Sequence, residues 1–280
     1  MAIKMDGKAL AEKLRLQIHD EVQTLSRKPT LAVILVGEDP ASQVYVRNKE
    51  KDCVECGIKS QGYRLPAEIS EKQLLELIEE LNQNPLVDGI LVQLPLPGHI
   101  SEKNVIRAIA PDKDVDAFHP YNVGNLMIGE EGFLPCTPAG VMELLKEYEI
   151  DPAGKECVVV GRSNIVGKPM ALLLLRRNGT VTICHSKTAD LKAQTLRADI
   201  LVSAVGKMNT ITADMVKDGA VVIDVAMNRN AEGKLCGDCD YEAVARKASY
   251  ITPVPGGVGP MTRLILMKNT LTAAKRHLEN

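Results

Sequence analysis

The chain has 280 residues, of which 45% are hydrophobic and 25% are charged. This composition is globular, excludes a disordered or fibrous protein, and at roughly 100 to 200 residues per domain predicts two domains. With 34 Lys and Arg against 36 Asp and Glu, no Trp and two Phe, the chain lacks the positive charge and the stacking side chains that nucleic-acid binding requires. We therefore expect a small-molecule ligand.

The aliphatic stretches, such as residues 171–175, fall far short of the ~18 residues needed to cross a bilayer, and the first six residues include charges before any apolar segment. We predict a cytoplasmic protein without a membrane partner. Seven cysteines, an odd number scattered along the chain, favour reduced thiols. The C-x-x-C pairs Cys53/Cys56 and Cys236/Cys239 lie too far apart in sequence for a zinc ribbon, so we predict no metal site.

Apolar residues recur at helical spacing from residue 6 to residue 26, which predicts an amphipathic helix. The aliphatic run 31–36, closed by Gly37, predicts a strand buried on both faces, with a helix beginning near Ala41. Helices alternate with further predicted strands at 57–65, 89–94, 157–160, 181–185, 200–205 and 221–225. This alternation is typical of right-handed βαβ units and parallel sheets.

Residues 111–138 break the pattern with Pro, Gly, Asn and Asp, and they predict a long ordered loop at a domain border. We place one domain at residues 1–138, completed by a C-terminal helix at 260–280, and the other at residues 139–259. A helix at 139–149 is expected to cross between them. The predicted fold class is α/β, with two parallel-sheet domains and a ligand cleft between them, outside the carboxyl ends of the strands.

A glycine turn follows the predicted strand 157–160. Gly161 permits a tight turn and Gly167 a close approach, so that the N–H groups at the start of the next helix face a phosphate. A plain strand–helix turn would carry the same glycines. At the end of the next strand, Ser186 and Lys187 stand where NAD sites place an acid, which suits a 2′-phosphate, although a solvated strand end would look similar.

Polar residues also occupy one face of the helix after residue 40. Ser42, Tyr45, Lys49 and Asp52 are spaced three, four and three residues apart, so they share that face. A phenol one turn from an ammonium group suits proton transfer, whereas a solvated helix face is the alternative. Gln93 lies at the carboxyl end of an apolar strand, where a buried amide needs a partner such as a ligand.

Two loops complete the set of candidate segments. Residues 113–116, Lys-Asp-Val-Asp, place two acids at the predicted domain border, where a capped turn is the alternative interpretation. Residues 252–262 contain three Gly and three Pro, a combination that makes a loop stiff yet able to approach a ligand closely. We expect the second loop to lie against a cofactor.

Together these segments closely resemble the bifunctional methylenetetrahydrofolate dehydrogenase/methenyltetrahydrofolate cyclohydrolase family, in the family's order and over nearly the whole chain. The matching motifs are Ser42-x-x-Tyr45-x-x-x-Lys49, Val-Gln-Leu-Pro-Leu-Pro at 92–97, Lys-Asp-Val-Asp at 113–116, Gly-Arg-Ser-x-Ile-Val-Gly-x-Pro at 161–169, Cys-His-Ser-Lys-Thr at 184–188 and Pro-Val-Pro-Gly-Gly-Val-Gly-Pro-Met-Thr at 253–262.

The resemblance implies NADP-dependent oxidation of 5,10-methylenetetrahydrofolate to 5,10-methenyltetrahydrofolate, followed by hydrolysis to 10-formyltetrahydrofolate, in one-carbon metabolism. It implies a homodimer whose subunits have an N-terminal catalytic domain and a Rossmann-like NADP-binding domain. Lys49 would be the central catalytic group, supported by Tyr45 and Gln93 with Ser42 nearby, and Asp116 would hold the pterin. The residues implied for the dinucleotide are Gly161, Arg162, Ser163, Ile165, Ser186, Pro253, Gly256, Gly257, Val258 and Thr262.

The sequence departs from the family at Ala117, where Gly is usual, and at Cys239, where Val is common. Neither position carries a catalytic group, but a methyl group at 117 disfavours some positive-φ geometries. Short-chain dehydrogenases also use Tyr-x-x-x-Lys, yet their glycine-rich loop precedes that pair and here it follows. A shikimate-dehydrogenase-like enzyme has the same domain order but a cofactor loop richer in Gly and Ala, and a nucleotide sensor would not need the four polar residues at 42, 45, 49 and 93.

Overall fold

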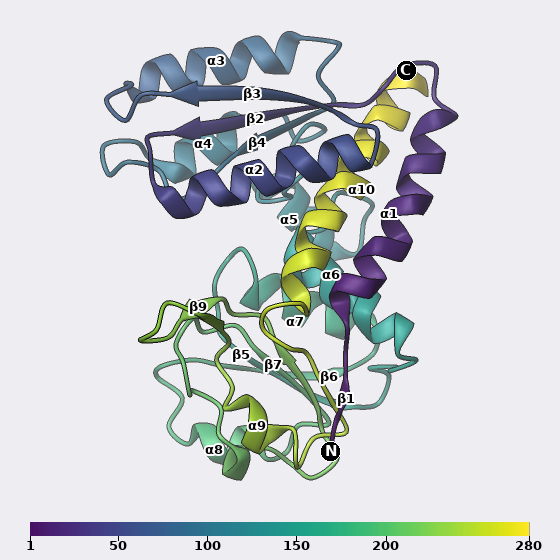
Figure 1. The fold of residues 1–280 in the computed structure, drawn as a ribbon, viewed down its shortest axis with the longest axis vertical. Helices are drawn as coiled ribbons and strands as arrows, with labels where there is room; N and C mark the ends of the chain where they lie inside the picture. The colour runs from purple at the N-terminus through teal and green to yellow at the C-terminus, as the bar shows by residue number, and fades with distance from the viewer. Residues whose placement is uncertain (280) are drawn as a thin grey trace. The chain divides into compact units, whose positions relative to one another are not determined.

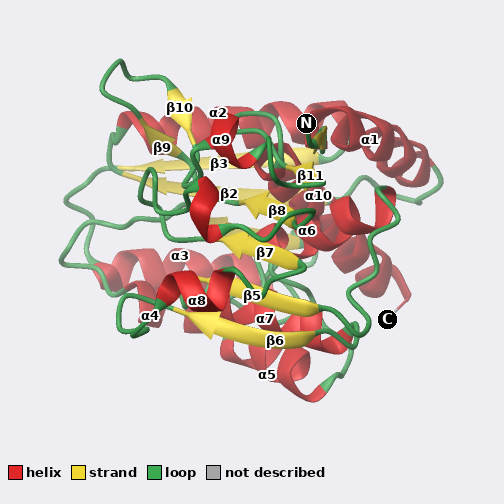
Figure 2. Ribbon diagram, turned by 90° about the horizontal axis from the view of Figure 1, so that it is seen from below, coloured by secondary structure: helices red, strands yellow, loops and turns green. Residues whose placement is uncertain are grey.

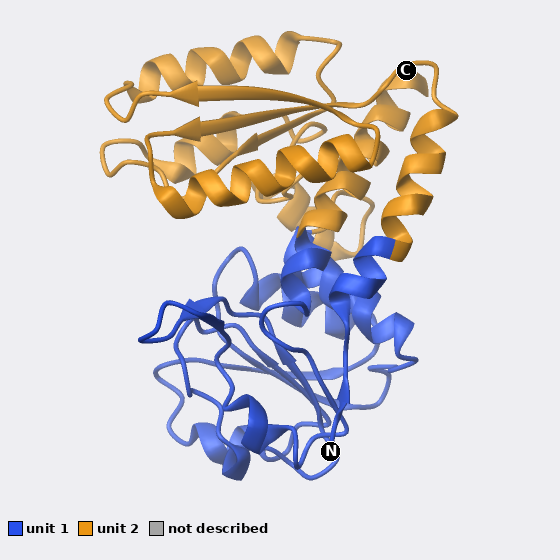
Figure 3. Ribbon diagram, in the orientation of Figure 1, with its two compact units in different colours: residues 1–12, 135–262 blue, residues 13–134, 263–280 orange. Residues whose placement is uncertain are grey.

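The computed structural model describes residues 1–279 and divides into two compact units. Unit 1 contains residues 1–12 and 135–262, and unit 2 contains residues 13–134 and those from 263 onward (Figure 3). Two helices, α1 (Gly7–Gln23) and α10 (Val258–Glu279), contribute residues to both units. No helix within residues 1–279 combines the length and the apolar character that a bilayer span requires.

A three-stranded parallel sheet forms the centre of unit 2, in the order β3-β2-β4 (Figure 1). β2 (Thr30–Val36) is buried along its whole length, which suits its central position between β3 (Lys59–Leu65) and β4 (Gly89–Val92). Aliphatic side chains of the helices pack on the strands to form one core. The helices of this unit are α2 (Pro40–Glu55), α3 (Glu71–Gln83), α4 (Glu102–Ala108) and α5 (Pro120–Ile128).

Unit 1 is built on a six-stranded, all-parallel sheet in the order β1-β11-β8-β7-β5-β6 (Figure 2). Its strands are β1 (Ile3–Lys4), β5 (Glu156–Val160), β6 (Thr180–Cys184), β7 (Ile200–Ser203), β8 (Val221–Asp224) and β11 (Tyr250–Ile251). Its other elements are α6 (Cys136–Glu147), α7 (Gly167–Arg176), α8 (Leu191–Thr195), the 3-10 turn Ala213–Met215, the hairpin of β9 (Asn228–Arg229) and β10 (Leu235–Cys236), and α9 (Tyr241–Val244). The α/β class with parallel sheets, predicted from the alternation of elements, is confirmed, whereas the cleft between domains stays a prediction.

Residues 1–12 lie in unit 1, whereas most of the predicted domain 1–138 lies in unit 2. β1 pairs in parallel with β11, with Ile3 opposite Tyr250, and the Asp6 amide donates to the Tyr148 hydroxyl at 2.7 Å. A two-residue strand has no sequence pattern of its own. β1 joins the unit 1 sheet because residues 250–251, much later in the chain, form the strand β11 with which it pairs.

The predicted loop 111–138 contains α5 and the start of α6, so that prediction was wrong. Its Pro and Gly mark helix ends: Pro120 occupies the first turn of α5, and Gly129 ends the helix with φ of 83°. His119 caps the first turn, because its Nδ1 accepts from the Tyr121 amide at 3.0 Å. The helix predicted at 139–149 corresponds to α6, which lies wholly within unit 1 and does not cross.

Ala117, at the position where Gly is usual in the resembled family, adopts φ of 60° and is fully buried. Its N–H donates to the carbonyl of Asp114 at 3.0 Å, which closes a tight turn. The methyl group therefore does not prevent the left-handed conformation at this site.

Glu149 also has positive φ, 55°, and follows the C-terminus of α6 on the protein surface. Its N–H donates to the Lys146 carbonyl and the next amide donates to the Leu145 carbonyl, an arrangement that favours glycine at this position. We predict that Glu149→Gly raises the free energy of unfolding by about 0.5 to 1 kcal/mol, because the left-handed conformation is unfavourable for a residue with a Cβ.

The measurement is the midpoint of urea denaturation. The matched control is Lys146→Gly, three residues earlier within α6, which should lower stability by about 1 kcal/mol through lost helix propensity. A lower midpoint for Glu149→Gly would contradict the backbone argument.

Candidate active site

Lys49 and Gln93, which lie 44 residues apart in the chain, meet in unit 2. The Lys49 ammonium donates to Gln93 Oε1 at 3.1 Å, and the Gln93 amide donates to the Leu94 carbonyl at 2.7 Å. Gln93 directly follows β4, and its backbone N–H donates to the Ile34 carbonyl of β2 at 2.9 Å. Sheet pairing thus fixes the amide, and Lys49 is the partner that the sequence left open.

Helix α2 presents Ser42, Tyr45 and Lys49 on one face. The helix begins after Asp39, whose carboxylate accepts from the Ser42 amide at 2.7 Å, and this bond lowers the pKa of Asp39. Ser42 is buried, and Tyr45, one turn before Lys49, is half-buried. The face is therefore not the solvated one that the alternative interpretation required.

Asp52, on the following turn, connects α2 to two other helices. Its carboxylate forms ion pairs with Arg15 of α1 at 3.4 Å and with Nε of Arg263 of α10 at 3.0 Å, the latter without hydrogen-bond alignment. Only 7% of the side chain is exposed, and burial raises the pKa of Asp52 although both arginines oppose the shift. Breaking a buried ion pair is costly, so this contact fixes the position of α2 and with it that of Lys49.

The segment 113–116 divides into two structural residues and one accessible carboxylate. Lys113 donates to three carbonyls at the end of α3, those of Leu81, Asn82 and Asn84, and Asp114 accepts from Phe118, His119 and Asn122. The capped-turn interpretation therefore describes Lys113 and Asp114. Asp116 is half-buried and borders a small, largely apolar cavity beside the end of β4.

In unit 1 the glycine turn after β5 packs tightly against its surroundings. Gly161 has φ of 132°, and a Cβ there would lie 2.4 Å from the Ala204 carbonyl oxygen, while a Cβ on Gly167 would lie 2.3 Å from the Gly161 carbonyl oxygen. Ser163 Oγ accepts hydrogen bonds from the amides of residues 166 and 167. These two N–H groups therefore stabilise the turn itself and, contrary to the expectation from the sequence, do not face a phosphate. Arg162, Ser163 and Ile165 are exposed.

The end of β6 lies beside this turn. Val160 is opposite Cys184 in the sheet, and the Gly161 amide donates to the Cys184 carbonyl at 2.9 Å. Arg162 and Ser186, each two residues beyond that pair, therefore emerge at the same sheet edge, and both are exposed. Neither strand end carries an acid, so the residues fit a dinucleotide with a 2′-phosphate.

The Gly/Pro loop, residues 252–262, follows β11 at the same carboxyl edge, and two strands, β8 and β7, separate β11 from β5. Gly257 closes it by donating to the Pro253 carbonyl at 2.9 Å, and Gly256 has φ of 105°. Pro253, Gly257 and Val258 are buried, whereas Gly256 is half-buried. Val258 opens α10, two residues before the predicted start, and Thr262 Oγ1 shares a hydrogen bond of 3.0 Å with Thr137 Oγ1.

Sequence reasoning missed two buried carboxylates at this edge, Asp224 and Asp238. Asp224 ends β8 and accepts from the amides of Asp238 and Cys239 at 3.0 and 2.8 Å, and burial raises its pKa. An acid closing the aliphatic run 221–224 was a usable signal, because a buried carboxylate demands several donors. Asp238 had no such signal, since its partners lie far away in sequence.

The cysteines form no assembled site. None of the seven, which all lie within the described residues, is in a disulfide, and burial raises the pKa of both Cys53 and Cys56 to about 12. Within residues 1–279, no group of three or more His, Cys, Asp or Glu is placed to hold a metal ion.

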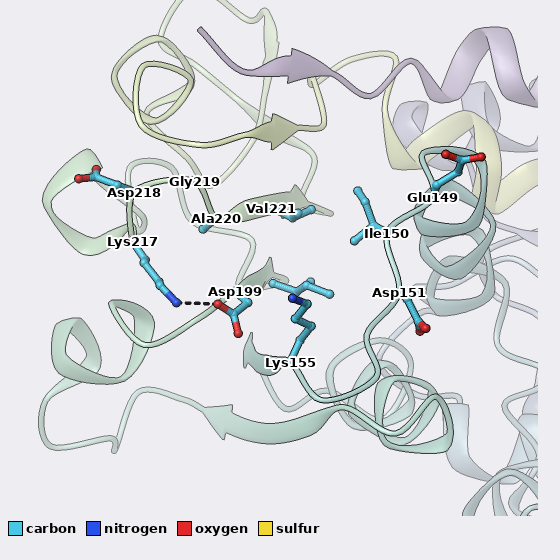
Figure 4. A pocket seen from close by; sticks show the side chains of 11 residues that line it. Glu149, Ile150, Asp151, Lys155, Asp199, Lys217, Asp218, Gly219, Ala220 and Val221 are labelled. Carbon is cyan, nitrogen blue, oxygen red and sulfur yellow. Dashed lines mark hydrogen bonds and ion pairs between the residues drawn. The ribbon is translucent and has the colours of Figure 1, made fainter.

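A separate pocket of about 270 Å³ lies at the opposite, amino edge of the unit 1 sheet (Figure 4). It is lined by residues before β5 and at the starts of β7 and β8, including Lys155 and Val221. Lys217 and Asp199 are paired there at 2.6 Å, as the dashed line in the figure marks. Its lining has four carboxylates and two lysines, and the carboxylates form no group placed to hold a metal ion within residues 1–279, so we do not assign it a ligand.

The fold and these sites define a two-part α/β enzyme, in which unit 1 is a Rossmann-type dinucleotide-binding domain and unit 2 carries the candidate site around Lys49. The family model described as tetrahydrofolate dehydrogenase/cyclohydrolase, catalytic domain, matches residues 5–116, and the model for the NAD(P)-binding domain matches residues 135–278. The chain belongs to the tetrahydrofolate dehydrogenase/cyclohydrolase family.

Individual relatives agree with this assignment. The bifunctional protein FolD of Moorella thermoacetica is 60% identical over 275 residues, covering 97% of this chain and 98% of the relative. The FolD methylenetetrahydrofolate dehydrogenase/cyclohydrolase structure from Campylobacter jejuni superposes with a TM-score of 0.97 at 52% identity over 99% of both chains. The Trypanosoma brucei enzyme, solved with NADP and an inhibitor, gives a TM-score of 0.95 at 38% identity over 100% of this chain and 99% of that one.

Proposed function

We infer that this chain oxidises 5,10-methylenetetrahydrofolate to 5,10-methenyltetrahydrofolate with NADP and hydrolyses the product to 10-formyltetrahydrofolate, within one-carbon metabolism. The observation that carries the inference is the 3.1 Å hydrogen bond between Lys49 and Gln93, in a chain whose other unit has no acid directly after β5 or β6. Hydride transfer needs both ligands at once, whereas hydrolysis needs the folate alone.

The oxidation depends mainly on orientation. The methylene carbon lies between two folate nitrogens, and both stabilise the cation that remains when hydride leaves, so no strong base is needed. We propose that Asp116 holds the pterin, because a carboxylate accepts paired hydrogen bonds from an aminopyrimidinone edge. NADP, when bound, supplies the hydride acceptor.

The hydrolysis depends on proton transfer. Water must attack the methenyl carbon and lose a proton, and one carbon–nitrogen bond must then break as that nitrogen is protonated. We propose that Lys49 handles these protons, with Gln93 holding its ammonium and Tyr45 and Ser42 completing the polar surroundings. The hydrogen bond to Gln93 supports this role, because it orients the flexible lysine side chain.

For the dinucleotide we propose Arg162 and Ser186 as ligands of the 2′-phosphate, with Gly161, Ser163 and Ile165 along the turn. The Gly/Pro loop would pack on the remainder, through Pro253, Gly256, Gly257, Val258 and Thr262. The burial of Pro253, Gly257 and Val258 restricts their contribution to shaping the loop, so Gly256 and the residues around it are better placed to contact the ligand.

We also propose a cytoplasmic homodimer. β6 is an edge strand of the unit 1 sheet; Ile183 within it is 41% exposed, and Leu175 of α7 is 57% exposed. An open sheet edge with exposed aliphatic side chains favours pairing, and a second copy is the simplest self-complementary partner.

The first test of the function replaces Lys49. We predict that Lys49→Met lowers hydrolysis of methenyltetrahydrofolate by about 100-fold or more, because proton transfer contributes 10²- to 10⁴-fold, and leaves measurable dehydrogenase activity. The control is Lys51→Met, which removes an exposed ammonium from the same helix and should leave both rates unchanged. Parental hydrolysis by folded Lys49→Met would refute the assignment.

The second test concerns the phosphate site. We predict that Arg162→Ala reduces the ratio of kcat/KM for NADP over NAD by about 10- to 100-fold, the size of one lost charge-assisted hydrogen bond. Arg177→Ala removes an exposed arginine beyond the other end of α7 and should not change the ratio. An unchanged ratio in Arg162→Ala would mean that the 2′-phosphate binds elsewhere.

The third test concerns assembly. Light scattering should give a dimer mass for the parent and half that mass for Ile183→Lys, because a charge on an apolar interface opposes pairing. Leu86→Lys, at a site in unit 2 that is 64% exposed, should remain dimeric. A monomeric parent, or a dimeric Ile183→Lys, would contradict the proposed edge.

A further inference from the structure

The loop that follows β7 is held by a single buried carboxylate. Asp238 is 0% exposed and lies 35 residues after the end of the strand. It accepts five hydrogen bonds, from Ser203 Oγ at 2.9 Å, the amides of Val205, Gly206 and Lys207 at 2.8, 3.3 and 2.8 Å, and Asn228 Nδ2 at 3.1 Å. Three consecutive backbone N–H groups thus converge on one internal anion, which sets the conformation of residues 204–207.

The position of Asp238 is itself fixed from β8. Its amide donates to Asp224 Oδ1 at 3.0 Å. Gly237, just before it, packs so closely that a Cβ there would lie 2.0 Å from Asp224 Oδ2. The restraint therefore passes from the end of β8 through Asp238 to the loop after β7.

This loop occupies a defined place at the ligand edge of the sheet. From β5 the chain continues to β6 on one side, and β7 then lies on the other side of β5, so the strand order reverses between β5 and β7. Dinucleotides bind across such a switch point. The Ala204 carbonyl forms one wall of that point, directly against Gly161.

The two sides of the switch point receive different halves of the ligand. The second strand, here β6, reads the adenosine ribose, and the turn after the first strand holds the pyrophosphate. The nicotinamide half therefore lies over the β7 side. There Val205 and Gly206 are exposed, and a Cβ on Gly206 would meet nothing within 4 Å.

We propose that Asp238 is a positioning residue for the dehydrogenase reaction: it holds residues 204–207 in the conformation that receives the nicotinamide half of the dinucleotide. The proposal rests on the proposed NADP-dependent function. Asp238 acts through the loop and does not touch the ligand itself. Its effect should therefore be confined to the nicotinamide half and be absent from the adenosine half and from hydrolysis.

The test is Asp238→Asn, which keeps the size of the side chain but turns an N–H group toward donors, leaving at least one loop amide unpaired. We expect the dissociation constant of NADP to rise and kcat/KM for NADP to fall, each by about tenfold or more. KM for methylenetetrahydrofolate, and hydrolysis without dinucleotide, should change less than about twofold. The inhibition constant of adenosine 2′,5′-bisphosphate, a probe of the adenosine half alone, should also stay within about twofold of the parental value.

Parental binding and kcat/KM for NADP in Asp238→Asn would overturn the proposal. So would an equal loss of affinity for adenosine 2′,5′-bisphosphate, or a parallel loss of hydrolysis, because either would indicate a general structural role. If that variant does not fold, Ser203→Ala removes one donor without exposing a backbone amide and should show the same pattern at about threefold. Unchanged NADP binding by Ser203→Ala would then overturn it.

The matched control is Asp240→Asn, two residues further on, whose exposed carboxylate only caps α9 and should leave every constant unchanged. Measurements on the parental enzyme distinguish a failure of this inference from a failure of the proposed function. A parent that neither oxidises nor hydrolyses the folate would refute the function, whereas titration of NADP against parent and Asp238→Asn still decides the role of Asp238.

Discussion

The pairing of β5 with β6 on one side and β7 on the other is the constraint on which unit 1 depends. In this register Val160 stands opposite both Cys184 and Ser203, so the three strands end at one level. The three loops that follow start side by side, and the proposed phosphate ligands come from two of them. Close pairing also dictates glycine at 161, because any side chain there would meet the Ala204 carbonyl.

The same principle builds the lysine site of unit 2 from a smaller sheet. β2 pairs with β4 so that Ile34 stands opposite Val92, and Gln93 is the next residue. α2 follows β2 and returns along the sheet, which brings Lys49 to that amide. Asp52 and its two arginines hold the helix in place, so a flexible lysine is positioned by a buried ion pair on one side and an amide on the other.

The sequence predicted what depends on local pattern. Aliphatic runs located the central strands, and the three- and four-residue spacing of Ser42, Tyr45 and Lys49 placed them on one helix face. The sequence-based prediction failed for α5, because residues such as Pro120 and Gly129 occur at helix ends as well as in loops. Only the cap at His119 distinguishes a helix from a loop here. The prediction also failed for Asp238, whose amide partners lie 31 to 33 residues earlier in the chain and carry no periodic signal.

The sharing of α1 and α10 between the units has a consequence for synthesis on the ribosome. In many two-domain proteins the N-terminal domain folds while the rest is still being translated. Here β1 finds its partner only when residues 250–251 have emerged, and unit 2 lacks the Arg263 contact to Asp52 until α10 has begun to leave the exit tunnel. Both units must therefore wait for the same late segment. A nascent chain halted before it would hold a unit 1 sheet that lacks the β1–β11 pair and a unit 2 that lacks α10, and such an unfinished chain would be a natural substrate for chaperones.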